Sequence, residues 1–471
     1  VRFCERLGGE TPPCLLGVLV NYYQIFIRYL FRRLNGYKFL LSPNIPSKEL
    51  DGIQMNDVKK DIVVNSVLEA EIQKCAKCGK CRSICPVFIE TGNESMVARG
   101  RISLAESLRS GEIFHTELLR DYLLSCKKCL RCSSICPSGV DYDLIIQTML
   151  DDVASHLGIW FIPRMIFRLF LTRRWLFNIL LKAASLFQRL VPLKRHGTMR
   201  HLPLMFMGGR WIPPLSKKSA LNKYRNTRKI TNPKMKVGFY VGCLINYVYT
   251  DIADAVIEVL NHLGVEVVVP PKQLCCGIPA RSLGDVKTAR KLAEVNVKVF
   301  EEANVDFIIN ACATCGRTLK RDYPRILGDR ALKFTDKLYD ISEFIEKYFA
   351  YETKALNTKI TYHDPCHLYW GQNISKQPRD ILRRASEFQE METPERCCGG
   401  GGVFNLLHYD LSMKIGEYKA KAIEKSGAEV VATGCPGCRL QIEDLLAAKG
   451  SAVKCTHTIQ VLRDAMLSPT K

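Results

Sequence analysis

The sequence predicts a multidomain α+β protein in which a helical, cysteine-rich module precedes a duplicated α/β region. Two observations carry this prediction. A C-x2-C-x2-C-x3-C-P run occurs twice before residue 140, and three later cysteine positions recur at a nearly constant offset. The 471 residues, 47% of them hydrophobic, are enough to build two or three packed domains.

Five segments follow one another along the chain. They are an N-terminal extension of unknown role (1–54), the helical module (55–152), a basic amphipathic connector (153–235) and the two α/β halves (236–355 and 356–471). The apolar run 11–27 contains Asn21 and Gln24, and the charges before it cancel. A secretory signal peptide needs a positive N-terminal region, so we expect no secretion signal here.

Each cysteine run of the helical module has the spacing of a ferredoxin motif. Three thiolates at this spacing bind one face of a cubane, and the fourth cysteine of each run binds the other cluster in two-cluster ferredoxins. We therefore expect two [4Fe-4S] cubane clusters, the first on Cys75, Cys78, Cys81 and Cys136 and the second on Cys126, Cys129, Cys132 and Cys85. Zinc, which prefers two separated cysteine pairs, is the less favoured alternative.

The segment between the two runs is long for a compact bacterial ferredoxin. It includes a helix-like stretch over 96–110, which favours a helical two-cluster ferredoxin module. Crosswise binding by the fourth cysteines ties both runs to both clusters and fixes their separation. Electron relay is therefore the expected function of this module.

The two C-terminal halves repeat one arrangement. Cys243 to Cys366 spans 123 residues, Cys275 to Cys397 spans 122 and Cys312 to Cys435 spans 123, which indicates a duplication. Apolar, β-branched runs precede the cysteines, and helix-length periodic stretches separate them. The expected strands are 236–241, 307–310 and 429–432, and the expected helices are 252–263, 286–302 and 409–425. Each half is therefore predicted to fold around a mainly parallel sheet, with ligands at the carboxyl ends of its strands.

Each half holds a lone cysteine, a Cys-Cys-Gly triplet and a C-x2-C pair. The first-half cysteines are Cys243, Cys275, Cys276, Cys312 and Cys315, and the second-half cysteines are Cys366, Cys397, Cys398, Cys435 and Cys438. Five thiols exceed the four ligands of one cubane, so we expect one or two further [4Fe-4S] clusters, cubane or expanded to a non-cubane form. Gly277 and Gly399 either point backbone N–H groups at cluster sulfurs or simply form tight turns.

Three polar residues lie next to the second-half cysteines in the sequence. His363, Asp364 and His367 are candidates for relaying protons to a cluster or a substrate thiol, although a structural hydrogen-bonding role is the favoured interpretation.

Cys4, Cys14 and Cys455 fall outside the pattern and receive no role. The sequence has no G-x-G-x-x-G after a predicted strand and no P-loop, so a flavin would have to come from a partner.

The positive charge is concentrated in one segment. Residues 153–250 contain 18 Lys and Arg and no acidic residue, whereas the rest of the chain has 50 basic and 47 acidic residues. A basic stretch interleaved with Trp and Phe suits an anionic membrane surface better than nucleic acid. We expect residues 157–229 to contact such a membrane or a partner protein, the alternative being core packing of their aromatic side chains. Charges interrupt every apolar run in 157–191, so no transmembrane span is predicted. Prolines in the connector predict short helices.

The complete motif set resembles the CCG-domain iron-sulfur oxidoreductases. This family includes the iron-sulfur subunits of glycolate, D-lactate and anaerobic glycerol-3-phosphate dehydrogenases, together with heterodisulfide reductase subunits. The resemblance covers about residues 68–462 and rests on both ferredoxin runs, Gly242-Cys243, Cys275-Cys276-Gly277, Asp364-Pro365-Cys366-His367, Cys397-Cys398-Gly399 and Cys435-Pro436-Gly437-Cys438. The stretches 136–140 and 405–407 look more like the glycolate oxidase branch.

The resemblance implies one of two functions. In the dehydrogenase branch, such a subunit relays electrons from a flavoprotein dehydrogenase subunit toward quinone or another membrane electron carrier. In the heterodisulfide reductase branch, a non-cubane cluster reduces a disulfide. We expect the first function, in a cytoplasmic protein held peripherally on the inner face of the membrane, and keep the second as the alternative.

Overall fold

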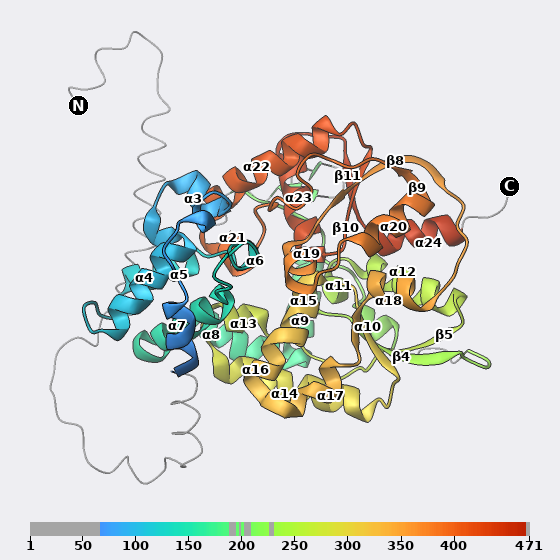
Figure 1. Ribbon diagram of the computed structural model, residues 1–471. Coiled ribbons are helices and arrows are strands. Elements are labelled where there is room, and N and C mark those ends of the chain that lie inside the picture. The colour runs from blue at the N-terminus through green and yellow to red at the C-terminus, as the bar shows by residue number, and fades with distance from the viewer. Residues whose placement is uncertain (1–65, 188–194, 197–198, 202–208, 226–229, 468–471) are drawn as a thin grey trace.

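The computed structural model describes residues 66–187, 195–196, 199–201, 209–225 and 230–467. The N-terminal extension, Cys4 and Cys14 lie outside the described residues, as do parts of the connector. Figure 1 shows the helical module, blue to teal, beside the two α/β halves. The second half, orange to red, lies above the first half, green to yellow, in this view.

The helical module is a small bundle around its own core. A helix over 66–73 is followed by η1 (Lys80–Arg82), α3 (Pro86–Thr91), η2 (Glu94–Met96), α4 (Ala98–Arg109), α5 (Glu117–Leu124), α6 (Arg131–Ser134) and α7 (Tyr142–Leu157). The α4 helix matches the helix predicted between the two cysteine runs. Side chains of Thr116 and Asp141 cap α5 and α7 by accepting hydrogen bonds from backbone N–H groups. Ile102, Leu123 and Ile145 pack inside the bundle.

The first half alternates strands and helices. It contains β4 (Met235–Tyr240), α11 (Cys243–Tyr247), α12 (Thr250–His262), β5 (Val265–Val268), α13 (Ile278–Ser282), α14 (Val286–Glu302), β6 (Phe307–Asn310), α15 (Ala313–Arg317), η5 (Thr318–Asp322), α16 (Tyr323–Leu327), η6 (Gly328–Ala331), α17 (Leu332–Thr335), β7 (Leu338–Asp340) and α18 (Ile341–Tyr348). The predicted strand over 307–310 and the predicted helix over 286–302 have these bounds in the structure.

The second half repeats the plan of the first. It contains β8 (Leu356–His363), α19 (Cys366–Gln372), α20 (Lys376–Ala385), β9 (Ser386–Phe388), α21 (Val403–Leu407), α22 (Tyr409–Lys425), β10 (Val430–Thr433), α23 (Pro436–Ala448), β11 (Lys454–His457) and α24 (Thr458–Leu467). Its sheet has the order β9-β8-β10-β11, and the first-half sheet has the order β5-β4-β6-β7.

All neighbouring strands in these two sheets run parallel. The sheet order is therefore the same in both halves, which confirms the duplicated α/β region. Cys312 follows β6 and Cys435 follows β10, so both lie at the carboxyl edge of their sheets. Parallel strands end at a common edge, and this geometry gathers the cysteines of each half there.

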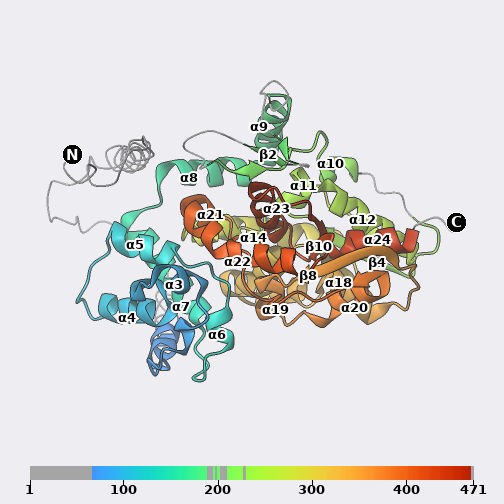
Figure 2. The same ribbon diagram turned by 90° about the horizontal axis from the view of Figure 1, so that it is seen from above.

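The connector forms short elements on one face of the molecule. They are α8 (Phe161–Ile166), the π-helical turn η3 (Phe167–Leu171), α9 (Arg174–Phe187), a small antiparallel sheet of β1 (Arg195–His196), β2 (Met199–His201) and β3 (Trp211–Ile212), and α10 (Ala220–Lys223). Figure 2 shows α8, α9 and β2 on this face, with α9 projecting from the rest. Among the described residues, no helix combines the length and apolar character needed to cross a bilayer.

A buried ion-pair network joins the helical module to the first half. Asp143 of α7 pairs with Arg317 and Arg325, and Arg317 also donates to Asp322 at 2.8 Å. Burial alone would raise the pKa of Asp143, but the two arginines hold it at about 2. Arg281 pairs with Asp151, further along α7. These contacts fix the module against the first half.

Candidate iron-sulfur centres

Two small cavities inside the helical module collect the ferredoxin-type cysteines. One is lined by Cys75, Cys78, Cys81, Cys132 and Cys136. The other is lined by Cys85, Cys126, Cys129 and Cys132. The fourth cysteine of each run thus lies beside the first three of the other run, as crosswise cluster binding requires.

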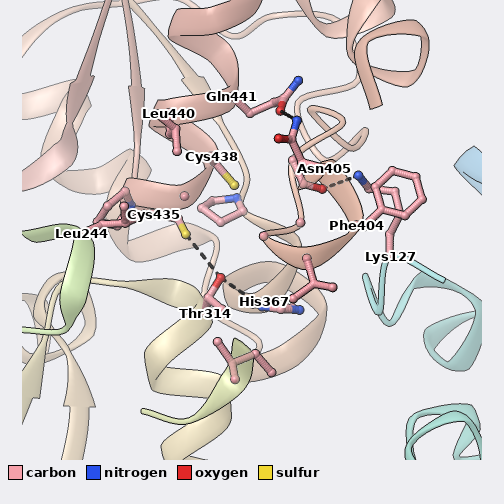
Figure 3. Close-up of a pocket in the computed structure, with 18 of the residues that line it drawn as sticks. Lys127, Leu244, Thr314, His367, Phe404, Asn405, Cys435, Cys438, Leu440 and Gln441 are labelled. Atoms are coloured by element: carbon pink, nitrogen blue, oxygen red, sulfur yellow. Dashed lines mark hydrogen bonds between the residues drawn. The ribbon is translucent and has the colours of Figure 1, made fainter. Parts of the chain in front are cut away.

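A much larger cavity of about 410 Å³, here called the central cavity, lies where the two halves meet the module. It is lined by every member of the two five-cysteine groups except Cys275, and also by Cys126 and Cys129 of the module. Figure 3 shows Cys435 and Cys438 on its wall, with Thr314 next to Cys435 and His367 next to Thr314. The structure therefore unites the two predicted five-cysteine groups around one space.

The thiols form a continuous row from one half to the other. Successive contacts run along Cys243, Cys275, Cys276, Cys315, Cys312, Cys435, Cys438, Cys398 and Cys397. The halves meet at Cys312 and Cys435, which are equivalent positions of the duplication. Burial raises the pKa of Cys366, and the neighbouring thiol of Cys129 adds to the effect.

Some of these thiols have a lowered pKa and therefore lose their proton readily. The thiols of Cys275 and Cys315 donate to Cys276 and lower its pKa to about 5. Cys397 and Cys438, with His363 beside them, lower the pKa of Cys398 in the same way. A thiolate is the form that binds metal, so each half contains a thiol that is favoured in the ligand form, while burial and neighbouring thiols raise the pKa of most of the others.

The residues present fit an iron-sulfur cluster. His363 is only 1% exposed, and among the described residues no nitrogen or oxygen atom pairs with its ring nitrogens, so the sulfur of Cys398 is the group that its ring faces. A ring nitrogen of His363 and the sulfurs of Cys398 and Cys438 lie within 4.8 Å of one another. A buried imidazole that faces only thiols is weakly satisfied, and a cluster held by these sulfurs would offer its N–H group a more negative acceptor.

The other two polar candidates have different surroundings. Asp364 is held in a bidentate pair with Arg379, with N–O distances of 2.9 and 2.5 Å, which gives it a structural role. His367 lies on the cavity wall: its Nε2 is 2.9 Å from the backbone oxygen of Lys128, and its Nδ1 is 3.2 Å from Thr314 Oγ1. Because Nε2 faces a carbonyl oxygen, Nε2 carries the proton and donates it. Nδ1 of the neutral ring therefore accepts a hydrogen bond from the Thr314 hydroxyl.

Both glycines of the Cys-Cys-Gly triplets form turns, and Gly277 also donates a backbone hydrogen bond to a sulfur. Gly277 and Gly399 have φ values of 92° and 86°, which favour glycine. The Gly277 amide donates to the Cys275 thiol. At Gly399, a Cβ would lie 2.1 Å from the backbone oxygen of Ser412, so α22 packs directly on this backbone. The cofactor-binding role of these glycines stays a prediction.

Sequence reasoning missed residues that join the three domains. Lys127 donates to the backbone oxygens of Gly399 and Gly400 in the second half, and its ammonium lies 4.2 Å from the ring centroid of Phe404. Thr314, inside the first-half C-x2-C pair, contacts Cys435 of the second half. The adjacent lysines inside the second ferredoxin run were the available signal, but a sequence alone does not show which carbonyls they reach.

The connector also reaches the first-half cysteines. Leu171, Arg174 and Phe177 line a small cavity together with Cys243 and Cys275. Arg174 donates to the backbone oxygen of Pro271 at 2.6 Å. The inner face of α9 therefore covers one end of the row of thiols.

Comparison with known proteins agrees with this architecture. Residues 237–320 and 360–443 match the family described as "Cysteine-rich domain" (CCG), and residues 71–140 match "4Fe-4S dicluster domain". The probable glycolate oxidase iron-sulfur subunit of Bacillus subtilis is 31% identical over 84% of this chain and 94% of its own length. One subunit of the dihydromethanophenazine:CoB-CoM heterodisulfide reductase of Methanosarcina barkeri is 24% identical over 90% of this chain and 98% of its own.

A partial relative has the same character. One subunit of the CoM/CoB fumarate reductase of Methanothermobacter marburgensis is 38% identical over 49% of this chain and 46% of its own length. All three relatives are subunits of oxidoreductases, and the two matched domains indicate multiple [4Fe-4S] clusters. The chain therefore belongs to the CCG-domain family of iron-sulfur oxidoreductase subunits.

Proposed function

We propose that this chain is the electron-transfer subunit of a membrane-associated oxidoreductase. It takes electrons from a flavoprotein dehydrogenase of the glycolate, D-lactate or glycerol-3-phosphate type and delivers them to quinone or another membrane carrier. The proposed ligands are the crosswise sets of the helical module and the five cysteines of each half. The clusters supply one-electron redox chemistry when bound, and the chain supplies their order and surroundings.

One observation carries this proposal. Cys126 and Cys129 of the helical module line the same cavity as the cysteines of both halves. Electron transfer requires short separations between redox centres, and clusters held by cysteines of this shared wall would lie close to one another. The Arg317–Asp143 pair and the Lys127 contacts hold the module in that position.

The connector supports the membrane side of the proposal. Its outer face exposes Trp175, Ile179 and Leu180 at 63%, 57% and 49%, while the inner face of the same helix covers Cys243 and Cys275. Arg173 and Lys182 belong to the same stretch of chain. Apolar side chains with basic neighbours suit an anionic lipid surface, and we propose that α9 docks there on the inner face of the membrane.

The proposal is tested on anaerobically purified holoprotein. We expect about sixteen irons, and we expect a short-chain quinone analogue to reoxidise the reduced clusters, as followed by electron paramagnetic resonance. About eight irons would contradict the assignment of ligands in the two halves. Clusters that stay reduced in the presence of the quinone analogue would contradict the proposed acceptor.

A second candidate, disulfide reduction, is favoured by the central cavity itself. It has cysteines of both five-thiol groups on its two sides, and His363 and His367 lie on its wall. The same holoprotein is therefore mixed with a thiol-cofactor heterodisulfide. A new, substrate-dependent paramagnetic signal would support this candidate, whereas unchanged spectra favour the relay function.

A further inference from the structure

The two ferredoxin-type cavities of the helical module differ in their surroundings. They are here called the outer site, with Cys75, Cys78, Cys81 and Cys136, and the inner site, with Cys85, Cys126, Cys129 and Cys132. Cys78 of the outer site is exposed. Cys132 also lines the outer cavity, and Cys126 and Cys129 also line the central cavity. The inner site is therefore the link between the outer site and the two halves.

Lys127 is a buried cation that lines both the inner site and the central cavity. It is 8% exposed, and its ammonium donates to the backbone oxygens of Gly399 and Gly400 and lies 4.2 Å from the ring centroid of Phe404 (Figure 3). Carbonyl groups and an aromatic ring carry no net charge, and no carboxylate pairs with Lys127 in the part of the chain that the structure describes. Burial raises the pKa of the Cys129 thiol, and the charge of Lys127 counteracts this.

Arg101 of α4 is a second buried cation of the inner site. It is 2% exposed and donates to the backbone oxygen of Tyr122 at 2.8 Å, to the hydroxyl of Ser125 at 2.7 Å and to the hydroxyl of Tyr142 at 3.4 Å. Within the described ranges, no carboxylate pairs with this guanidinium. The nearby sulfur of Cys126 would stabilise the guanidinium if it carried negative charge.

The other cations around the two sites are close to carboxylates or exposed to water. At the inner site they are Lys128, near Asp143, and Arg131, paired with Glu395; at the outer site they are Lys77, paired with Glu106, Arg99, paired with Glu94, and Lys80, which is exposed. Carboxylates and water weaken the effect of these charges on a cluster. Of the cations that the structure describes at the two sites, Arg101 and Lys127 are thus the two that act from the interior without a counter-charge.

Buried cations of this kind call for an anion beside them. A buried charge without a counter-ion is costly, and a [4Fe-4S] cluster held by four thiolates is an anion that gains further negative charge on reduction. Burial alone would disfavour the more negative, reduced state of the inner cluster. The two cations act in the opposite sense, and their interaction with the cluster is stronger in the interior than it would be in water.

We propose that Arg101 and Lys127 hold the reduction potential of the inner site above that of the outer site. An electron that enters the module at the exposed outer site is then passed inward: the outer cluster is oxidised as the inner cluster is reduced. The inference rests on the proposed crosswise ligand sets, and it deepens the proposed relay function by giving the direction of electron flow inside the module.

The first test uses the unmodified, anaerobic holoprotein. It is titrated potentiometrically with dithionite, which supplies the electrons, and the ferredoxin-type signals are followed by electron paramagnetic resonance. A neutral dysprosium chelate in the solvent shortens the relaxation of the outer-site signal, because Cys78 is exposed, and thereby assigns the two signals. We expect the signal that the chelate affects less to appear at the higher potential. The reverse order would overturn the proposal, and this measurement does not depend on the folding of any variant.

The second test removes the charges one at a time. We expect Lys127→Met and Arg101→Met to lower the potential of the inner site and to leave that of the outer site unchanged. Lys127→Arg and Arg101→Lys keep the charge and should keep most of the potential. A role limited to holding the second half against the module would leave the inner potential unchanged. Iron quantification shows that each variant is folded and loaded.

Lys80→Met is the matched control, because Lys80 lines the outer cavity but is exposed to water. We expect it to shift the outer potential less than Lys127→Met shifts the inner one, and we expect that small shift to vanish at high salt. The shift in Lys127→Met should persist at high salt, since a buried charge is screened much less.

The outcomes separate the two levels of the proposal. Fewer than two ferredoxin-type signals in the unmodified holoprotein would overturn the ligand sets, and with them the proposed relay. Two signals at unchanged potentials in Lys127→Met and Arg101→Met would overturn the role of these cations, while the ligand sets would stand. Equal shifts in Lys127→Met and Lys80→Met would overturn the argument from a buried charge without a counter-charge.

Discussion

Asp340, the last residue of β7, is a buried carboxyl group that also begins α18. Its side chain accepts a hydrogen bond from the Ser342 amide at 2.9 Å, and Glu343 completes a capping box. Its other carboxylate oxygen has no partner among the described residues. Burial raises the pKa of Asp340 to about 7, well above its value in an unfolded chain.

The raised pKa of Asp340 makes the stability of the fold depend on pH in a definite direction. Folding favours the protonated form of Asp340, so its stabilising contribution is complete below about pH 4 and is lost as the pH rises through about 7. We expect the free energy of unfolding to fall between about pH 4 and 7, by an amount on the order of a few kcal/mol, and the thermal midpoint to fall with it. Asp340→Asn, which keeps the cap, should flatten this dependence. Anaerobic thermal unfolding of both proteins tests it, and an unchanged slope in the variant would contradict it.

Asp143 is the residue whose loss should weaken the attachment of the helical module. Asp143→Ala leaves the Arg317 guanidinium, 2% exposed, without one of its two carboxylates. Breaking a buried pair from one side costs about 3–5 kcal/mol. Lys376→Ala is the control, because Lys376 is 82% exposed in its pair with Asp380, and such pairs contribute about 0–1 kcal/mol. Equal unfolding midpoints for the two variants would show that the network does not stabilise the fold.

At the scale of elements, hydrophobic periodicity predicted the regular parts of the fold. The predicted segments 286–302, 307–310 and 409–425 are α14, β6 and α22, because long amphipathic helices and buried strands leave strong patterns. The strands β1 to β3 have only two or three residues each, which is too short for any periodicity. They were not predicted.

The spacing in the sequence identified all the candidate cysteines. It did not predict that the two five-thiol groups contact each other in the folded chain. Thr314 and His367 are 53 residues apart, and Lys127 and Gly400 are 273 apart. Contacts of this kind depend on how domains pack, and no local pattern in one sequence records them. The sequence therefore predicted two separate five-thiol groups, and the folded chain joins them through Cys312 and Cys435.

The α9 helix carries a prediction of its own about membrane binding. Trp175→Glu combined with Ile179→Glu changes two exposed side chains and leaves the inner face intact. Each apolar side chain buried in lipid contributes roughly 1.5–3 kcal/mol, so binding to phosphatidylglycerol-containing vesicles should fall by at least about tenfold. Co-sedimentation with such vesicles and with neutral phosphatidylcholine vesicles measures it.

Phe114→Glu provides the control for that experiment. Phe114 is 78% exposed but belongs to the helical module, between α4 and α5. We expect this variant to bind anionic vesicles like the unmodified protein, with a salt dependence set by the basic connector. Equal loss of binding in both variants, or equal binding to neutral vesicles, would argue against docking through α9.

At the scale of the whole molecule, the helical module, the two halves and α9 contact one another in a fixed order. The module touches the second half through Lys127 and Cys129, and the halves touch through Cys312 and Cys435. The first half touches α9 through Tyr247, whose hydroxyl donates to Asn178 beside the cavity that Cys243 lines. Cys78, in the first run of the module, is exposed. In the proposed relay, the module would face the protein donor and α9 would face the membrane.

Crosswise binding gives the sharpest test of that arrangement. Cys85 belongs to the first run but lies with Cys126, Cys129 and Cys132, so Cys85→Ser should impair the cluster of the second run. Cys136→Ser should impair the other one, because Cys136 lies with the first run. Electron paramagnetic resonance of each reduced variant, with iron quantification, distinguishes the two losses. Cys455→Ser removes a buried thiol that lines neither cavity, and it should leave all clusters in place. If Cys85→Ser instead removed the cluster of its own run, each run would bind a cluster by itself, and the tie between the two runs would be absent.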